Sequence, residues 1–451
     1  MSTILIKNGW IVGKGIRDIL IRDNLIEKVE VDITVEPEAD SRVIDAENKY
    51  LYPGLVNTHH HLTQSLAKAM PSGINCDLNA WLPAVPFALF DKLDAEIVYY
   101  SALMGLYELI RSGCTTCADH FYIYHRDVDM EIEHALLQAA EDMGVRFVFC
   151  RGGATHTGSH KGLRSTNLES EDVDLYLRRL ESSLASHHQA QPDAMLKLVA
   201  APTTIVHSSP PEDLVRISAF ARENVLRMHT HLLEVAFDEE MAQERYGMPA
   251  IDYAESCGWL GDDVWFAHLV QADSYTIDKL AKNKTGIAHC PTSNCRLGSG
   301  IARVPEMAKK GVPVSIGVDG SASSESASMI NEMMLTWLVH RAANGPQTTD
   351  AAEVLDWASK SGAEVLGYEN LGEIAPGQLA DLSIINLDHA RFDGVWMKEY
   401  APVLCGEPCE VETVIINGRQ VFSDGQPTHI DMEETRSKAQ ACVKKLMRSL
   451  S

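Results

Sequence analysis

The hydrophobic pattern of the chain changes character at Pro53-Gly54. Before this point, residues 3–50 alternate apolar and polar side chains in short runs separated by Gly and Asn, which is typical of β-strands joined by turns. After it, apolar runs alternate with amphipathic segments, a texture that predicts parallel strands connected by helices. Strands are expected in the first part at Ile4–Lys7, Ile19–Arg22, Ile26–Val31 and Arg42–Ile44.

Eight apolar runs in the middle of the chain predict eight parallel strands, each followed by helical sequence. This order predicts an α/β fold, a (β/α)₈ TIM barrel whose active site lies at the C-terminal ends of the strands. The strands are expected at Leu55–His59, Thr115–Asp119, Arg146–Arg151, Leu196–Ala201, Arg227–His231, Val264–His268, Gly286–His289 and Val314–Asp319. Helices are expected at Glu96–Arg111, Val173–Leu184, Pro211–Arg222, Ser274–Ala281, Ile330–Ala342 and Ala351–Leu366, among others.

Strand-like alternation returns after residue 366. The runs are Gly372–Ile374, Asp381–Ile385, Val411–Ile416 and Gln420–Phe422. Asn417-Gly418 between two of these runs is a strong hairpin signal. The sequence therefore predicts three units: a small composite β-sandwich built from both chain ends, residues 1–53 and 367–428; the barrel, residues 54–366; and a C-terminal helix, residues 429–451.

The composition is ordinary for a globular enzyme, but the charge is strongly acidic. The 451 residues include 63 acidic and 39 basic side chains, a net charge of −24, which repels polyanions and argues against a nucleic-acid partner. The N-terminus lacks a secretory pattern, and no apolar run approaches the roughly 18 residues needed to span a bilayer. The ten cysteines are scattered, and Cys114 and Cys117 have no second pair nearby. These features predict a reduced, cytoplasmic protein without a membrane partner.

Strands one, five, six, seven and eight of the predicted barrel all end in histidine or aspartate. Because the C-terminal ends of barrel strands share one face, these side chains are expected to converge. Imidazoles with one carboxylate suit Zn²⁺ and leave a coordination position for water. The residues are His59 with His61 two positions beyond it, His231, His268, His289 and Asp319.

A single His-x-His pair is more often an ordinary feature than a metal site. His60 and His229 show that histidine is frequent here, and His289 has an alternative interpretation as a hydrogen-bonding residue of the barrel mouth. The recurrence of these residue types at the ends of strands one, five, six, seven and eight is what indicates a metal centre.

Several motifs occur in a characteristic order along nearly the whole chain. They are Pro53–His61, His231–Glu234, Ala267-His268, His289–Asn294, Gly317–Gly320 and Gly372–Leu382. In these motifs the sequence resembles the amidohydrolase superfamily, in the branch that contains the cytosine, guanine and S-adenosylhomocysteine deaminases and the triazine hydrolases.

This resemblance implies one divalent metal ion, Zn²⁺ or alternatively Fe²⁺. The ligands that it implies are His59, His61, His231 and Asp319. Bimetallic members of the superfamily commonly bridge two ions through a carboxylated lysine at the end of strand four. Here Lys197 lies near the start of that strand and no lysine lies at its end, so a single ion is expected.

The resemblance also implies hydrolytic deamination. A bound divalent ion lowers the pKa of water from about 16 towards roughly 7. Asp319 is expected to take the proton of this water, and Glu234 to carry protons to the ring nitrogen and to the departing ammonia. His268 is expected to orient the attacking oxygen or to stabilise the tetrahedral intermediate. The carboxyl group of Glu234 favours deamination over dehalogenation, because ammonia must be protonated to leave and chloride need not be.

Three further side chains are candidate substrate contacts. Gln64 lies three residues after His61 and offers both a donor and an acceptor to a heterocycle. Trp81 can stack on a flat ring, or alternatively fill the core. Arg151, at the end of strand three, can hold a ring carbonyl, or alternatively form a structural ion pair.

Together with Gln64, Arg151–Gly153 and Val318–Ser323 resemble bacterial deaminases of oxidised bicycles, whose substrates include isoxanthopterin and 8-oxoguanine. The alternatives are a guanine-type, adenosine-type or s-triazine aminohydrolase, and a metal-free scaffold without activity. The superfamily resemblance also implies a homo-oligomer and a small heterocycle with water as reactants.

Overall fold

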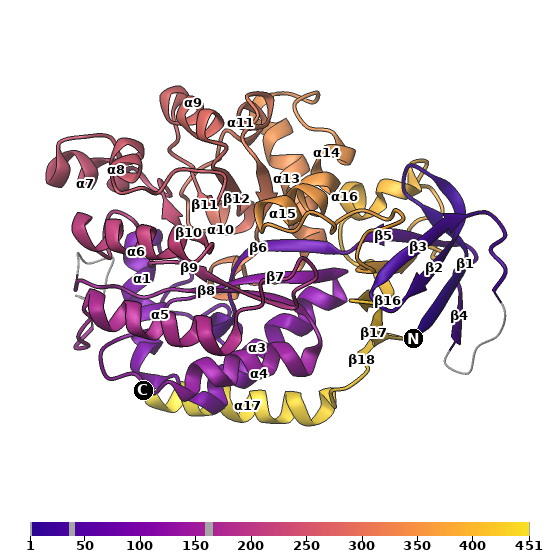
Figure 1. Ribbon diagram of the computed structural model, residues 1–451, viewed down its shortest axis with the longest axis horizontal. Helices are drawn as coiled ribbons and strands as arrows, with labels where there is room; N and C mark the ends of the chain where they lie inside the picture. Colours follow the sequence, from indigo (N-terminus) through magenta and orange to yellow (C-terminus); the bar gives the residue numbers. More distant parts are fainter. Residues whose placement is uncertain (1, 36–40, 158–165, 451) are drawn as a thin grey trace.

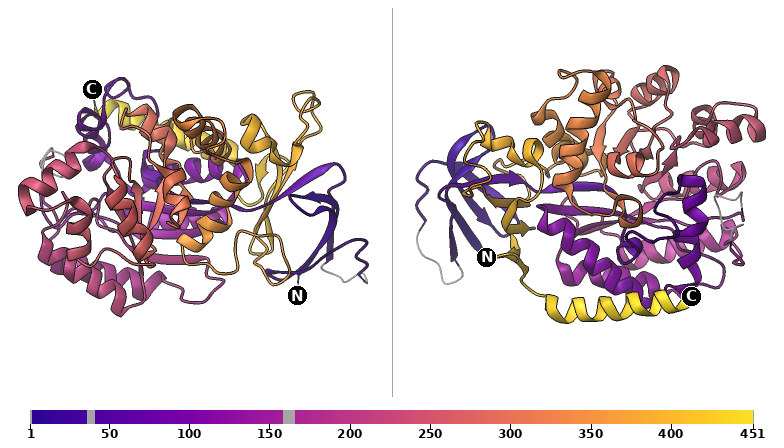
Figure 2. Two further views of the ribbon diagram at one scale, coloured as in Figure 1. Left: turned by 90° about the horizontal axis from the view of Figure 1, so that it is seen from above. Right: turned by 180° about the vertical axis from the view of Figure 1, so that it is seen from behind.

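The computed structural model describes residues 2–35, 41–157 and 166–450. It contains two large β-sheets, one parallel and curled and the other mixed (Figure 1). Helices pack around the parallel sheet, and the mixed sheet lies at one end of the molecule, as both views of Figure 2 show. Among the residues described, no helix combines the length and the apolar character needed to cross a bilayer.

The parallel sheet has nine strands in the order β13-β12-β11-β10-β9-β8-β7-β6-β14. The strand positions predicted from apolar runs are confirmed, and most strands are buried along their length because both faces of the sheet are covered. Their bounds are β6 Leu55–His61, β7 Cys114–Phe121, β8 Arg146–Arg151, β9 Leu196–Ala200, β10 Arg227–Leu232, β11 Val264–His268, β12 Gly286–His289, β13 Val314–Ile316 and β14 Asp319–Gly320.

The two outermost strands in this order, β13 and β14, belong to one stretch of chain interrupted only at residues 317–318. β13 pairs with β12, whereas β14 pairs with β6, where Asp319 lies opposite His60. Gly317 permits this passage, because a Cβ there would lie 2.7 Å from the Cβ of His59. The stretch 314–320 thereby brings Asp319 beside the first strand of the sheet.

The longer helices agree with the predicted positions, with one exception. The helix predicted over Ala351–Leu366 is two helices, because Ser359 has non-helical backbone angles and the carbonyl of Ala358 accepts the N–H of Val56 in β6. The longer helices are α3 Ala95–Arg111, α4 Glu131–Met143, α5 Val173–His187, α6 Pro211–Glu223, α7 Ala236–Tyr246, α9 Ser274–Asn283, α13 Met329–Asn344, and α14 Ala351–Trp357 followed by α15 Lys360–Val365. Short helices are α1 Leu78–Ala84, α2 Pro86–Leu89, α8 Ala250–Ser256, α10 Pro291–Arg296, α11 Val304–Lys309, α12 Ser321–Ser324, α16 Ala401–Cys405, η1 Leu62–Gln64, η2 Phe90–Lys92 and η4 Lys398–Tyr400.

The mixed sheet combines strands from both ends of the chain in the order β18-β17-β16-β15-β5-β1-β2-β3, with β4 paired to β1. The junction is the antiparallel pair β5–β15. Its strands are β1 Thr3–Ile11, β2 Gly15–Arg22, β3 Leu25–Glu30, β4 Ser41–Asp45, β5 Lys49–Pro53, β15 Leu382–Asn386, β16 Glu410–Ile416, β17 Arg419–Ser423 and β18 Gln426–Pro427.

Turn chemistry explains one correct and one wrong expectation in this sheet. The hairpin at Asn417-Gly418 is confirmed, with φ of 50° and 71° at the two turn residues, as the tight two-residue turn requires. The strand predicted at Gly372–Ile374 is wrong, because Gly372 has a φ of 87° and this stretch forms bends instead of ladder pairs.

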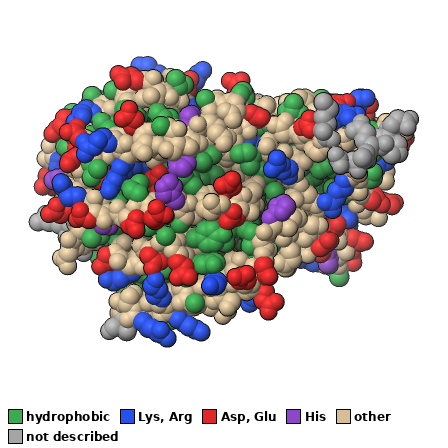
Figure 3. Space-filling model, turned by 60° about the horizontal axis from the view of Figure 1, so that its bottom comes forward, with side chains coloured by type: hydrophobic (Ala, Val, Ile, Leu, Met, Phe, Trp, Pro, Cys, Tyr) green, Lys and Arg blue, Asp and Glu red, His purple; other side chains and the backbone are tan. Residues whose placement is uncertain are grey.

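The C-terminal helix is confirmed as α17, Met432–Ser449, which runs along α3 and buries Cys442 and Leu446 in a cluster that includes Ile97 (Figure 1). Acidic and basic side chains are interspersed with apolar ones over the face shown in Figure 3.

A buried ion pair joins the two sheets. Arg146 on β8 contacts both carboxylate oxygens of Asp381, each at 2.9 Å, and neither side chain is exposed. Asp381 also accepts the backbone N–H of Asn417, and Arg146 donates to the carbonyls of Asp193 and Ala194. Because the partners satisfy each other, the pair fixes how the mixed sheet sits against β8.

Asp381→Ala should lower the free energy of unfolding by about 3–5 kcal/mol, because it leaves the guanidinium of Arg146 buried without its counter-charge. Denaturant titration followed by circular dichroism measures the loss. The control is Asp263→Ala, which breaks the partly exposed pair with Arg222 and should cost less than about 1 kcal/mol. Equal losses in the two variants would contradict the structural role of the buried pair.

Candidate functional site

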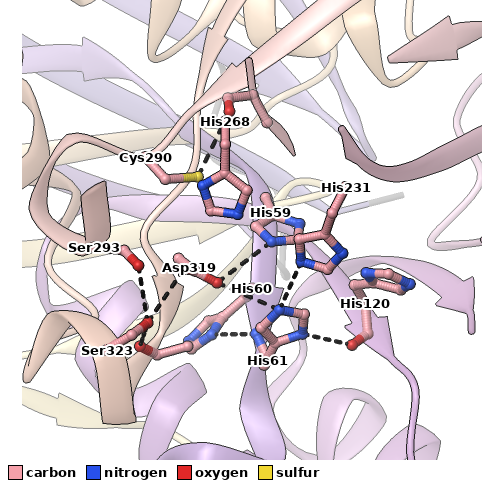
Figure 4. Close-up of polar contacts among 12 residues, drawn as sticks. His59, His60, His61, His120, His231, His268, Cys290, Ser293, Asp319 and Ser323 are labelled. Atoms are coloured by element: carbon pink, nitrogen blue, oxygen red, sulfur yellow. Dashed lines mark hydrogen bonds and ion pairs between the residues drawn. The ribbon is translucent and has the colours of Figure 1, made fainter. Parts of the chain in front are cut away.

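Four side chains from three strands converge at the C-terminal edge of the parallel sheet (Figure 4). His59 and His61 come from β6, His231 from β10 and Asp319 from β14. One nitrogen or oxygen of each lies within 4.8 Å of the corresponding atoms of the others. The structure therefore brings together the complete ligand set that the sequence predicted.

The distances between these atoms fit a single small cation. Nε2 of His61 lies 3.3 Å from Nε2 of His231 and 3.3 Å from Oδ1 of Asp319, and Nε2 of His59 lies 3.4 Å from the same oxygen. Ligands held about 2.0–2.1 Å from a tetrahedral Zn²⁺ would be separated by about 3.3–3.4 Å. Nε2 of His59 is buried and has no hydrogen-bond partner among the described residues, so a metal ion would satisfy an otherwise orphaned atom.

Backbone carbonyls fix two of the imidazole rings from behind. Nδ1 of His61 lies 2.8 Å from the carbonyl oxygen of His120, and Nδ1 of His231 lies 2.6 Å from that of Thr203. A carbonyl can only accept, so each Nδ1 carries the proton and each Nε2 presents a lone pair to the centre. Thr203 follows β9, at the strand end where the sequence showed no lysine.

His59 is fixed by a second histidine instead of a carbonyl. Nδ1 of His229 donates to the carbonyl of Trp265 at 2.9 Å, and the His229 ring stacks on the indole with centroids 4.4 Å apart. Nε2 of His229 is therefore an acceptor for the Nδ1–H of His59, at 2.8 Å. Sequence reasoning assigned no role to His229, although its spacing of two from His231 places both on one face of β10.

Burial and the neighbouring side chains together set the protonation of this cluster. It lowers the pKa of His59 well below its ordinary value, and it lowers the pKa of His231 to about 3, so both rings are neutral at pH 7. Burial opposes the charge of Asp319, but the neighbouring His59, His268 and His61 hold the pKa of this carboxylate well below its usual range. Neutral imidazoles with one carboxylate are the donors that divalent zinc prefers.

His268 and Glu234 face each other beside this cluster. Nδ1 of His268 donates to Oδ1 of Asn294 at 2.9 Å, which leaves its Nε2 3.8 Å from the carboxylate of Glu234. Burial disfavours charge on His268, but Glu234 and then Asp319 raise the pKa of this imidazole above its ordinary value. The predicted catalytic residues are thus adjacent, with His268 suited to donate a hydrogen bond.

Residues of the motif that follows His289 hydrogen-bond to His268 and, through Ser323, to Asp319. Asn294 orients His268, and Oγ of Ser293 lies 3.0 Å from Oγ of Ser323, which donates to Oδ2 of Asp319 at 3.1 Å. Backbone strain is also concentrated here, since φ is 75° at His268 and 58° at Asp319. Such conformations persist only where surrounding contacts hold them in place.

A cavity opens onto the cluster. Gln64 and Trp81, two of the three candidate substrate contacts, line it, and Trp81 also packs in an apolar cluster. Nε2 of Gln64 donates to the hydroxyl of Tyr122 at 2.9 Å, and Nε1 of Trp81 donates to the carbonyl of Ala322. The other lining residues are His61, Leu78, Leu82, Phe87, Tyr122, Thr203, Thr204, Val206, His207, His231, Leu232, Glu234, Asp238, His268, Leu297 and Asp319.

Arg151 does not line this cavity, so the substrate contact predicted for it is not what the structure shows. Its guanidinium is fully buried, contacts both carboxylate oxygens of Glu171 at 2.6 and 2.9 Å, and lies between the rings of Tyr124 and Tyr176. The alternative interpretation, a structural ion pair, describes this arrangement. The sequence could not separate the two because Glu171 lies 20 residues away along the chain.

His289 also lies outside the ligand cluster. Its Nε2 contacts Nε2 of His340 on α13 at 3.1 Å, and both rings are buried. The hydrogen-bonding role that was left open for His289 therefore agrees with the structure, whereas convergence with the other strand-end residues does not.

Comparisons of sequence and of fold show which known proteins this chain is similar to. Residues 50–421 match the sequence model described as the amidohydrolase family. An isoxanthopterin deaminase from an unknown prokaryotic organism is 39% identical over 429 residues, covering 92% of this chain and 89% of the relative. An 8-oxoguanine deaminase from Pseudomonas aeruginosa is 33% identical over 406 residues, covering 89% of each. The solved structure of atrazine chlorohydrolase from Arthrobacter aurescens TC1, complexed with zinc, has a TM-score of 0.90 and 26% identity, covering 98% of this chain and 100% of that one.

His229→Phe should weaken Zn²⁺ binding by about 10- to 100-fold, because the Nδ1–H of His59 loses its acceptor and the ring loses its orientation. Chelator competition with metal-free protein measures the affinity. His340→Phe is the control, since this histidine is equally buried but contacts no proposed ligand. Unchanged affinity in His229→Phe would show that His59 needs no such support.

Proposed function

This chain belongs to the amidohydrolase family, and on that premise we propose that it is a metal-dependent hydrolytic deaminase of an oxidised bicyclic amino-heterocycle. The proposed substrate is a pterin such as isoxanthopterin or the purine 8-oxoguanine, and ammonia is released. The observation that carries the proposal is that Glu234 and His268 line one cavity together with three of the four proposed ligands, His61, His231 and Asp319. The relatives named isoxanthopterin deaminase and 8-oxoguanine deaminase support the substrate class.

The proposed cofactor is one divalent ion, Zn²⁺ or alternatively Fe²⁺, held by the four converging side chains. When bound, such an ion supplies an activated water at neutral pH and stabilises developing negative charge. The distances between the ligand atoms and the orphaned Nε2 of His59 support this assignment. The zinc in the structure of the Arthrobacter chlorohydrolase supports the choice of metal.

The residues around the cavity can perform the proton transfers of deamination. Asp319 stays ionised at neutral pH, so one of its oxygens can accept a proton from the attacking water. Glu234 can then carry protons to the ring nitrogen and to the leaving amino group. His268, with Nε2 directed towards Glu234 and a raised pKa, can donate a hydrogen bond to the oxygen that gains negative charge.

We also infer that the curled parallel sheet is a closed (β/α)₈ barrel of residues 54–366. The pairing of β14 with β6 and of β13 with β12 supports closure. The mixed sheet is inferred to be a β-sandwich of residues 1–53 and 367–428, followed by the C-terminal helix, residues 429–451. An apolar cluster separate from those of the parallel sheet, which includes Ile6, Ile19 and Ile384, supports an independent unit.

A steady-state screen of ammonia release tests the substrate class. Isoxanthopterin or 8-oxoguanine should give a kcat/KM at least about 100-fold above those of adenosine and an amino-s-triazine, because buried polar groups discriminate strongly against substrates that leave them unpaired. Guanine and pterin, which lack the added oxo group, serve as matched comparisons. A preference for adenosine or the triazine would favour the alternative aminohydrolases.

Glu234→Gln should lower kcat by about 100- to 10,000-fold while the metal content stays equal to that of wild type, because the amide preserves shape but cannot transfer protons. Steady-state kinetics and elemental analysis of the same preparation measure both quantities. Glu240→Gln, an exposed change six residues further on, is the control. Activity within a few-fold of wild type would remove Glu234 from the proposed proton path.

A further inference from the structure

Asp238, in the first turn of α7, bridges two loops that form the cavity wall. Its Oδ2 accepts the backbone N–H of Glu234 at 2.9 Å, and its Oδ1 lies 3.0 Å from Nε2 of His207. Asp238 and His207 are buried and both line the cavity. One carboxylate thus connects the loop after β10, which carries Glu234, to the loop after β9.

The backbone next to Glu234 needs such support. Leu233 has a φ of 55°, so the chain turns sharply between the ligand His231 on β10 and Glu234. A residue in this region is strained unless its surroundings hold it. The bond from Asp238 satisfies the buried N–H of Glu234 immediately after the strained residue, and therefore holds the backbone from which its carboxylate projects.

His207, which Asp238 contacts on the second loop, is held by contacts of its own. The ring of His207 lies parallel to that of Phe237, with an interplanar angle of 6° and centroids 5.4 Å apart. The backbone N–H of His207 donates to Oγ1 of Thr204 at 3.1 Å. The same loop provides the carbonyl of Thr203 that orients His231, so one short segment supports both a proposed ligand and, through Asp238, the proposed proton carrier.

This bond is not an ordinary helix cap. The N-cap of α7 is Val235, which makes no side-chain hydrogen bond, and Asp238 donates its own N–H to the carbonyl of Val235. The carboxylate of Asp238 instead reaches backwards, out of the helix, to Glu234. The side chain of Asp238 therefore supports the strand-end loop in the cavity wall.

We propose that Asp238 is a positioning residue of the deamination, acting through Glu234. The inference rests on the proposed function. The carboxylate accepts one hydrogen bond from each loop and so holds the backbone of Glu234, whose carboxylate lies 3.8 Å from Nε2 of His268 where both line the cavity. An amide at this position could accept from only one of the two donors and would present an N–H₂ group to the other.

A double-mutant cycle distinguishes positioning from general support of the fold. Asp238→Asn should lower kcat/KM on the best substrate of the screen by about 10- to 100-fold, because small displacements of a catalytic group are costly. In a Glu234→Gln background, the same change should lower the residual rate by less than about threefold, since its effect passes through Glu234. Glu240→Gln, on the exposed side of the same helix, should be neutral in both backgrounds.

Metal content and melting temperature are measured for every variant, so that a loss of folded or metal-loaded protein is not read as lost positioning. If Asp238→Asn does not fold, Asp238→Glu completes the same cycle, because it keeps the charge but moves the carboxylate by one methylene. Wild-type rates in the single variant, or equal losses in both backgrounds, would overturn the positioning role of Asp238 but would leave the proposed function standing. A wild-type protein inactive on every substrate of the screen would overturn the proposed function, and this inference with it.

Discussion

The site is organised around three imidazoles, whose pKa values burial lowers, and one ionised carboxylate, with their lone pairs directed at one another across 3.3–3.4 Å. Lone pairs at such distances repel, and the divalent ion proposed to lie among them would offset this repulsion. The surroundings keep the lone pairs in this orientation: carbonyls of His120 and Thr203 and the ring of His229 occupy the protonated side of each imidazole. The contacts around the site therefore serve to keep these lone pairs directed at one point.

The curled sheet meets the constraint by bringing distant parts of the chain to one edge. β6 carries two of the histidines, and β14 reaches β6 only because Gly317 lets the chain pass His59 closely. The left-handed backbone at His268 and Asp319 turns each side chain into the cavity where the strand ends. Backbone strain of this kind is tolerated because a large buried core and the Arg146–Asp381 pair hold the sheet in place.

The positions of the strands, and the strand-end residues from which the proposed ligands come, could be predicted from the sequence. Strand interiors of a parallel sheet are continuous apolar runs, and His59, His231 and Asp319 stand where such runs stop. Local signals were also sufficient for the Asn417-Gly418 hairpin. They failed at 351–366, where a long-range bond from Val56 to Ala358 interrupts a continuous helical pattern.

What the sequence determined by itself was which segments form strands and helices and which side chains can bind a metal, because periodicity and ligand chemistry are local properties of the chain. Only the tertiary structure decided that Arg151 binds Glu171 instead of a substrate, that His229 supports His59, and that Asp238 joins two loops. Those roles depend on which distant groups meet. A side chain's chemistry lists the partners that it can take, and the fold selects among them.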